Sequence, residues 1–325
     1  MSGENTNPEG TEQTTNVGNS TPVNQLEKKI ATLFGIEAAL FCPSGTMTNQ
    51  IAIKCHTQPG DEMICDHLSH VYIYEGGGIA FNSGCQVKAL YGKRGMLTAE
   101  QVQNAINNPD DVHKARTSLV VAENTTNRGG GACYSFSALN EIKTVCSQHN
   151  LAFHLDGARV FNAIVANQES PKTYGQVFDS ISVCLSKGLG APVGSVLLGN
   201  TAFIKQARRV RKVFGGGMRQ AGILAAAGIY ALDHQLERLA VDHHHARLLA
   251  DAIAQKDFTS ELLPVSTNII IFEVTGRFTP KELAAKLKEQ GIVTTVISPT
   301  QIRMVLHLDI SAAMVEETLQ VISKL

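Results

Sequence analysis

Two kinds of segment alternate along this chain: short apolar runs, and longer segments in which apolar side chains recur every three or four positions. Short apolar runs at residues 119–123, 151–156 and 181–185 are typical of buried strands. Between such runs, apolar side chains recur every three or four positions at residues 22–34, which predicts an amphipathic helix that stops at Gly35. Strands that alternate with helices predict an α/β fold with a mainly parallel sheet.

The last third of the chain follows a different order. One long helix is expected from residue 232 to about residue 256. The pattern beyond it predicts a strand, a helix, two strands and a final helix, at residues 265–274, 280–290, 292–298, 302–307 and 312–324. We therefore predict a large domain over residues 21–235 and a small α+β domain over residues 236–325. The polar residues 1–20 have almost nothing to bury and are predicted to be disordered.

Composition narrows the class of protein. The net charge is −1, which gives no electrostatic reason to expect a nucleic acid or an anionic membrane as a partner. The seven cysteines are scattered without any C-x-x-C pair, which favours reduced thiols in a cytosol. No stretch approaches the roughly 20 continuous apolar residues that a membrane-spanning helix needs. These features predict a cytoplasmic protein.

Lys187 is the first candidate for chemistry. It follows the apolar run 181–185 and precedes a turn rich in glycine and proline, beyond which residues 196–198 form another apolar run. An unpaired charge between buried strands is costly, so the lysine needs an explanation. Either its side chain reaches the surface, or it is a Schiff-base lysine whose amine is dry and partly neutral.

Two further motifs favour the Schiff-base interpretation. The apolar run 151–156 ends in Asp156, and Ser44, Gly45 and Thr46 form a small-residue turn before a predicted helix. Pyridoxal phosphate (PLP) chemistry needs a lysine for the aldehyde and a carboxylate for the ring nitrogen. Its phosphate binds well at a helix N-terminus. The three motifs together predict a PLP site.

In this order, the motifs resemble those of the low-specificity L-threonine aldolases, which are PLP-dependent enzymes of fold type I in the β-eliminating lyase superfamily. Seven stretches carry the resemblance, and they follow one another from about residue 23 to the C-terminus. They are residues 41–50 (FCPSGTMTNQ), 69–78 (SHVYIYEGGG), 123–127 (ENTTN), 154–159 (HLDGAR), 186–192 (SKGLGAP), 215–220 (GGGMRQ) and 302–307 (IRMVLH).

The resemblance implies a large domain with a mainly parallel seven-stranded sheet and a small C-terminal domain. It also implies a homotetramer, and retro-aldol cleavage of L-threonine or L-allo-threonine to glycine and acetaldehyde. His70 is implied to stack on the PLP ring and to assist proton transfer at the β-hydroxyl group. Arg159 and Arg303 are implied to bind the substrate carboxylate, on either side of it.

Two departures from the family leave alternatives open. The Arg-Ser-Asp-Thr segment that usually begins these enzymes has no match here, and Thr126 stands where many relatives have a histidine. The stereochemical preference for the β-carbon is therefore not predicted. The alternatives are another PLP lyase, such as a phenylserine aldolase or a β-eliminating lyase, and a PLP-binding protein with impaired activity.

No metal site is predicted. His67 and His70 lie near Asp66, but the position of His70 in its motif assigns it to the cofactor. Three consecutive histidines at residues 243–245 point about 100° apart on a helix and cannot converge on one ion. We predict that these three lie at the surface.

Overall fold

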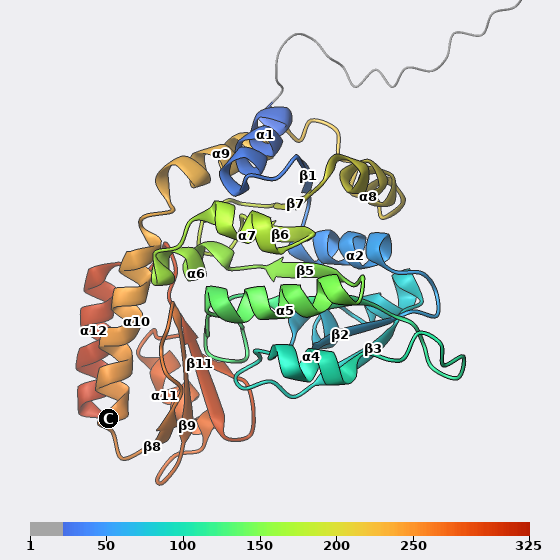
Figure 1. The fold of residues 1–325 in the computed structure, drawn as a ribbon. Helices are drawn as coiled ribbons and strands as arrows, with labels where there is room; N and C mark the ends of the chain where they lie inside the picture. The colour runs from blue at the N-terminus through green and yellow to red at the C-terminus, as the bar shows by residue number, and fades with distance from the viewer. Residues whose placement is uncertain (1–21) are drawn as a thin grey trace, which may run out of the picture.

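A computed structural model describes residues 22–325, which form two β-sheets with their helices (Figure 1). The predicted disordered tail, residues 1–20, lies outside the described residues. The first sheet has seven strands in the order β1-β7-β6-β5-β4-β2-β3. Its strands are β1 (Ala38–Cys42), β2 (Glu62–Asp66), β3 (Gln86–Leu90), β4 (Thr117–Glu123), β5 (Ala152–Gly157), β6 (Ser180–Cys184) and β7 (Ser195–Gly199).

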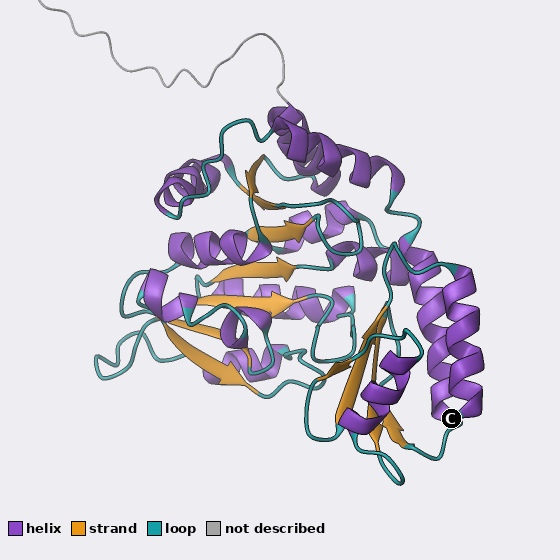
Figure 2. Ribbon diagram, turned by 180° about the vertical axis from the view of Figure 1, so that it is seen from behind, coloured by secondary structure: helices purple, strands orange, loops and turns teal. Residues whose placement is uncertain are grey.

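The seven-stranded sheet is mainly parallel, which confirms the predicted fold class. Strand β7 runs antiparallel to its neighbours β1 and β6, and the other neighbouring pairs are parallel. Every residue of β2, β4, β6 and β7 is buried, because helices cover both faces of the sheet (Figure 2).

Alternate side chains of β4 show how the two faces are filled. Val120 and Ala122 join the cluster that includes Leu139, from helix α5 (Phe136–Gln148). Leu119 and Val121 join another cluster with Ile53, from helix α2 (Gly45–His56) on the opposite face. The remaining helices of this part are α1 (Pro22–Phe34), α3 (His70–Ile73), η1 (Ile79–Ser83), α4 (Ala99–Ala105), α6 (Val160–Asn167), α7 (Pro171–Val177), α8 (Thr201–Val213) and α9 (Gly222–His234).

The second sheet is smaller and entirely antiparallel. Its order is β10-β11-β9-β8. It packs with helices around a separate apolar cluster that includes Leu249, Phe272 and Ile302. The elements are α10 (Leu239–Ala254), β8 (Thr259–Leu262), β9 (Ile269–Val274), α11 (Pro280–Glu289), β10 (Thr295–Val296), β11 (Gln301–Val305) and α12 (Ala312–Lys324).

Several predictions for this part were wrong in detail. The long helix expected from residue 232 begins only at Leu239, as α10, because residues 235–238 separate it from α9. Strand β8 was not predicted, since only two of its four residues are even half-buried and its apolar signal is correspondingly weak. The strand expected over residues 292–298 shrinks to the two residues of β10. The domain boundary at residues 235 and 236 stays a prediction.

The three consecutive histidines also differ from expectation. His243 and His245 are buried, and only His244 is exposed. Helix α10 packs against α6 on one side and α12 on another, so both of these side chains are covered. Nε2 of His243 lies 3.1 Å from Nδ2 of Asn162, an amide that donates to it.

Candidate active site

The predicted site residues gather at the carboxyl ends of the parallel strands. Asp156 is near the end of β5 and pairs in register with Glu123, the last residue of β4. Lys187 lies in the loop that follows β6, the neighbour of β5 on the other side. Open α/β sheets bind their ligands in the crevice outside the carboxyl ends of their strands.

Asp156 has one oxygen that is bonded and one that is not. Oδ1 accepts a hydrogen bond of 3.1 Å from the backbone N–H of Ala158. Oδ2 is buried and has no hydrogen-bond partner among residues 22–325. Burial, followed by the negative charge of Glu75, raises the pKa of Asp156. A cationic N–H donor placed at Oδ2 would satisfy this oxygen and restore its charge, as a protonated pyridine ring requires.

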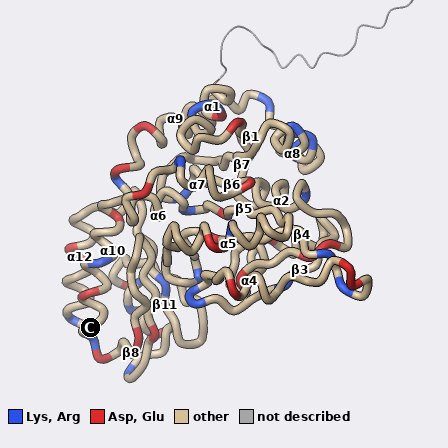
Figure 3. Tube along the Cα trace, viewed as in Figure 1, with Lys and Arg blue, Asp and Glu red and all other residues tan. Residues whose placement is uncertain are grey.

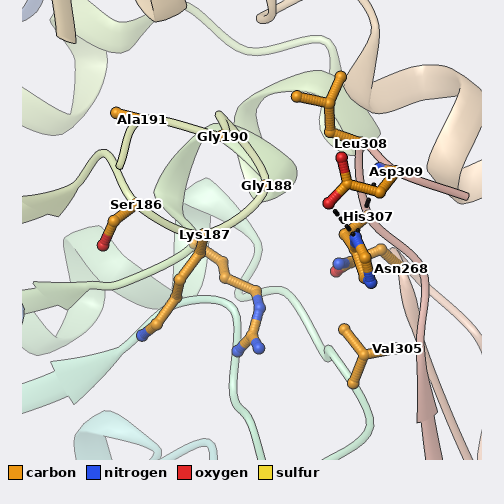
Figure 4. A pocket seen from close by; sticks show the side chains of 11 residues that line it. Ser186, Lys187, Gly188, Gly190, Ala191, Asn268, Val305, His307, Leu308 and Asp309 are labelled. Atoms are coloured by element: carbon orange, nitrogen blue, oxygen red, sulfur yellow. Dashed lines mark hydrogen bonds and ion pairs between the residues drawn. The ribbon is translucent and has the colours of Figure 1, made fainter. Parts of the chain in front are cut away.

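Lys187 lines two adjoining cavities. One, of 270 Å³, also contains Asp156 and His70, together with Ser44, Gly45 and Thr46. The other, of 410 Å³, lies between the loop of Lys187 and residues 305–309, which are the end of β11 and the loop after it (Figure 4). Lys187 is exposed in the structure, and the Schiff-base role predicted for it stays a prediction. The residue lies beyond the end of β6, where the covering helices no longer exclude water.

The turn at Ser44 begins helix α2. Ser44 is the N-cap, and its Oγ accepts the backbone N–H of Met47 at 3.2 Å. The N–H groups of Gly45 and Thr46 belong to the first helical turn, where no carbonyl of the helix can reach them. Because these groups line the cavity of 270 Å³, a phosphate bound there meets free donors and the positive end of the helix dipole.

His70 begins helix α3 and lies between two cavities. Its backbone N–H donates to Oε2 of Glu123 at 2.7 Å, and its ring Nδ1 is 3.1 Å from Oε1 of Glu75. The ring lines both the cavity that contains Asp156 and a cavity of 390 Å³ that contains Arg303. The hydrogen bond to Glu75 raises the pKa of His70 above its ordinary value.

The two predicted arginines come from different sheets. Arg159 precedes helix α6 and shares a cavity with Lys187. Arg303, on β11, donates from Nη1 to Oδ1 of Asn127 at 2.8 Å, while its Nε is buried without a partner among the described residues. Burial lowers the pKa of both guanidinium groups, and the charge of Arg303 lowers that of Arg159 further. Two desolvated cations near each other are suited to an anionic ligand.

Sequence reasoning missed several residues of this site. Glu75 is fully buried as a side chain, and it accepts from Nδ2 of Asn49 at 3.0 Å and from Nε2 of Gln50 at 2.7 Å. A sequence signal exists, because Asn49 and Gln50 are consecutive buried polar residues in helix α2. Glu123 was also missed as a titrating group: burial raises its pKa to about 7.

Thr126, which stands at the position of a histidine in many relatives, is buried. Its Oγ1 donates to the carbonyl oxygen of Arg94 at 2.9 Å. The hydroxyl therefore stabilises the loop after β4, and Thr126 is not among the residues that line the cavities of Lys187.

The fold and the site together define a PLP-dependent enzyme of fold type I. The unpartnered oxygen of Asp156 suits the ring nitrogen, and the free amides at the start of α2 suit the phosphate. Lys187 lies in the same cavity as both groups.

Comparisons with known proteins identify the family. The family model for beta-eliminating lyases matches residues 10–277. A low specificity L-threonine aldolase of Escherichia coli K12 is 40% identical over 301 residues, which cover 92% of this chain and 88% of that protein. The low-specificity L-threonine aldolase 1 of Arabidopsis thaliana is 38% identical and covers 91% of this chain and 84% of its own length. The chain belongs to the beta-eliminating lyase family.

Solved structures agree on the fold. A threonine aldolase of Leishmania major superposes with a TM-score of 0.81 at 21% identity, over 93% of this chain and 88% of that one. A serine palmitoyltransferase of Sphingomonas wittichii superposes with a TM-score of 0.74 at 18% identity, over 94% and 76%. At these identities the likeness concerns the fold alone.

Proposed function

We propose that this enzyme cleaves L-threonine, L-allo-threonine and related L-β-hydroxy-α-amino acids to glycine and an aldehyde, which for threonine is acetaldehyde. The observation that carries the proposal is the match to low-specificity L-threonine aldolases at about 40% identity over nearly the whole chain. The arrangement of Lys187, Asp156 and His70 around one cavity supports it.

Three groups would hold the cofactor. Lys187 supplies the amine for the aldehyde, and Asp156 accepts the ring N–H at Oδ2. Ser44, Gly45 and Thr46 hold the phosphate at the N-terminus of α2. When bound, PLP supplies an electron sink for the electron pair of the bond that breaks between Cα and Cβ.

Three further groups would act on the substrate. Arg159 and Arg303 bind the carboxylate, and this fixes which bond of the α-carbon stands perpendicular to the ring. His70 accepts the proton of the β-hydroxyl group, as its place between the cavities of Asp156 and Arg303 allows. The electron pair of the broken O–H bond then forms the carbonyl bond of the aldehyde.

We also propose a cytoplasmic homotetramer. The seven cysteines are all free thiols, as a reducing compartment favours. Within the described residues, no helix has both the length and the apolar character to cross a membrane. Basic and acidic side chains are interspersed over much of the chain, and a basic group lies on α8 (Figure 3). Large apolar side chains such as Phe81, Ile223 and Tyr230 are exposed, which is consistent with contacts between subunits.

The test is product analysis with purified, PLP-loaded protein. L-Threonine is expected to give glycine and acetaldehyde in equal amounts, and phenylserine to give glycine and benzaldehyde. Release of ammonia and a keto acid instead would identify a β-eliminating lyase. Visible absorbance from bound PLP without any product would identify a protein with impaired activity.

Substitution of the lysine tests its role directly. Lys187→Ala is expected to abolish product formation and the absorbance band of lysine-bound PLP, because Lys187 is the only amine among the described residues that line that cavity. Lys281→Ala, on the exposed side of α11, is the matched control and should retain both. An active Lys187→Ala variant would end the proposal.

A further inference from the structure

A row of polar side chains runs from His70 into the interior of the large sheet. Nδ1 of His70 lies 3.1 Å from Oε1 of Glu75, and Nδ2 of Asn49 lies 3.0 Å from the same oxygen. Oδ1 of Asn49 is 3.2 Å from Nε2 of His154. Nδ1 of His154 and Nε2 of His56 each lie 2.8 Å from Oγ of Ser180. Five hydrogen bonds thus join the surface of the cavity to three buried or half-buried residues behind it.

The chemistry of these groups fixes the direction of every bond in the row. A carboxylate only accepts, so Asn49 must donate to Glu75 from Nδ2 and accept at Oδ1. His154 must then carry its proton on Nε2, which leaves Nδ1 as an acceptor. The hydroxyl of Ser180 therefore donates to Nδ1 of His154, and its oxygen accepts from Nε2 of His56.

Burial keeps both interior histidines neutral, as this arrangement requires. It lowers the pKa of His154 to about 3 and that of His56 to about 4. Each ring then has one proton and one lone pair. His154 uses them in opposite directions along the row, whereas His56 ends the row and uses its proton toward Ser180. The orientation of Asn49 is consequently determined from behind as well as by Glu75.

A second amide holds the other oxygen of Glu75. Nε2 of Gln50 donates to Oε2 at 2.7 Å, while Oε1 of Gln50 accepts from Nδ2 of Asn82 at 3.1 Å. Glu75 is thus satisfied at both oxygens, whereas Asp156 in the same cavity has a free oxygen. The two neighbouring carboxylates therefore differ: Asp156 has an oxygen that can bind a ligand, whereas both oxygens of Glu75 are already hydrogen-bonded to protein side chains.

The hydrogen bond to Glu75 determines which ring nitrogen of His70 carries the proton. Since the carboxylate accepts, the proton of a neutral His70 lies on Nδ1 and the lone pair of Nε2 is unused. Other charges also face this ring: Asp156 and Lys187 act on it from the same cavity, and Arg303 lines the next one. The charge of Glu123 interacts with His70 as well, although its hydrogen bond to residue 70 is to the backbone N–H.

We propose that Glu75 is a positioning residue, which holds His70 with its proton on Nδ1 so that Nε2 is ready to accept the proton of the substrate's β-hydroxyl group. The row of Asn49, His154, Ser180 and His56 holds Glu75 in turn. The proton-transfer part of this inference rests on the proposed function, but the tautomer of His70 does not. Glu75 itself exchanges no proton with the substrate.

The first experiment uses nuclear magnetic resonance on the protein without added substrate. Histidine labelled with ¹⁵N reports which ring nitrogen carries the proton, and the His70→Gln spectrum assigns the signal of His70. The wild type is expected to show the Nδ1–H tautomer and a pKa above that of a free histidine. In Glu75→Gln the preference for this tautomer should weaken and the pKa of His70 should fall.

Glu62→Gln is the matched control. Glu62 is likewise buried and accepts from two side-chain amides, Gln86 at 2.6 Å and Asn107 at 3.0 Å, but it lies outside the site. Its substitution should leave His70 unchanged. If the wild type shows the Nε2–H tautomer, the inference is overturned without any variant. An unchanged His70 in Glu75→Gln overturns it as well.

The second experiment measures the pH dependence of threonine cleavage. Glu75→Gln should lower kcat about 100-fold, the lower range for a positioned acid or base, with a smaller change in KM. The acid limb of the kcat/KM profile should move to lower pH, because a less basic His70 stays neutral further into acid. Glu75→Asp should restore part of the rate.

These outcomes separate the two proposals. A wild type with the Nδ1–H tautomer but without threonine cleavage contradicts the proposed function and leaves the positioning of His70 standing. Threonine cleavage with a kcat and a pH profile that do not change in Glu75→Gln contradicts the inference and leaves the proposed function standing.

Discussion

The two sheets differ in how many charged side chains they bury near the site. At its carboxyl edge, the seven-stranded sheet collects Asp156 and Glu123, with relative exposures of 2% and 4%. The four-stranded sheet instead packs an apolar cluster, and its principal contribution to the site is Arg303. The large sheet thus places its buried charged side chains where a ligand can contact them. The antiparallel sheet contributes an apolar core and one charged side chain.

The topology explains this difference. Parallel strands end at a common edge, so side chains from β4, β5 and the loop after β6 converge there. Adjacent antiparallel strands end at opposite edges, and their side chains cannot converge in the same way. Arg303 reaches the site because its side chain, from the middle of β11, donates to Asn127 in the loop after β4.

The largest effect within this comparison is expected at Asp156. Asp156→Asn keeps the shape but removes the charge that holds a proton on the cofactor ring. Loss of one such electrostatic partner is expected to lower kcat about 1000-fold. Steady-state assays with L-threonine measure it, and Asp257→Asn, at an exposed position, should keep the wild-type rate. An Asp156→Asn variant with normal kcat would show that the edge of the large sheet is not the site of chemistry.

A smaller effect on catalysis is expected at Arg303, the charged side chain that the antiparallel sheet contributes to the site. Arg303→Lys keeps the charge but loses the planar fork that matches a carboxylate. Loss of one charged hydrogen bond, about 2 kcal/mol, should lower kcat/KM for threonine about 30-fold. Arg277→Lys, which is half exposed on the same small sheet region, is the control. Equal kinetics in the two variants would remove Arg303 from the carboxylate site.

The smallest effect concerns stability and its dependence on pH. Because the pKa of His154 is lowered to about 3, its contribution to stability is present above pH 6.5 and is lost as the pH falls. Between pH 6.5 and pH 5 the loss is about 2 kcal/mol. Urea unfolding of His154→Gln should therefore show a weaker dependence on pH by about that amount. His113→Gln, at an exposed histidine, should follow the wild type; identical slopes in all three proteins would contradict the neutral state of His154.

Local signals in the sequence predicted the large sheet and its helix starts well. In the structure, Thr98 forms a capping box with Gln101 and Thr279 forms one with Glu282, and such contacts depend only on residues three positions apart. The three predicted cofactor motifs line one cavity for a related reason: each lies at the end of a strand or at the start of a helix, and the parallel topology brings these ends together.

What the sequence could not predict depends on packing between distant elements. His243 and His245 are buried because α10 is covered on two sides, and nothing in their own helix indicates this. The role of Glu75 follows from hydrogen bonds to Asn49 and Gln50, which are about 25 positions away. The exposure of Lys187 likewise depends on where the covering helices stop.

The most direct test of this account is to locate the lysine that PLP modifies. Protein loaded with PLP is treated with borohydride, which fixes the cofactor to the lysine that holds it, and the modified peptide is identified by mass spectrometry after proteolysis. The account predicts one modified peptide, which contains Lys187. Modification of another lysine, with Lys187 left unmodified, would contradict it.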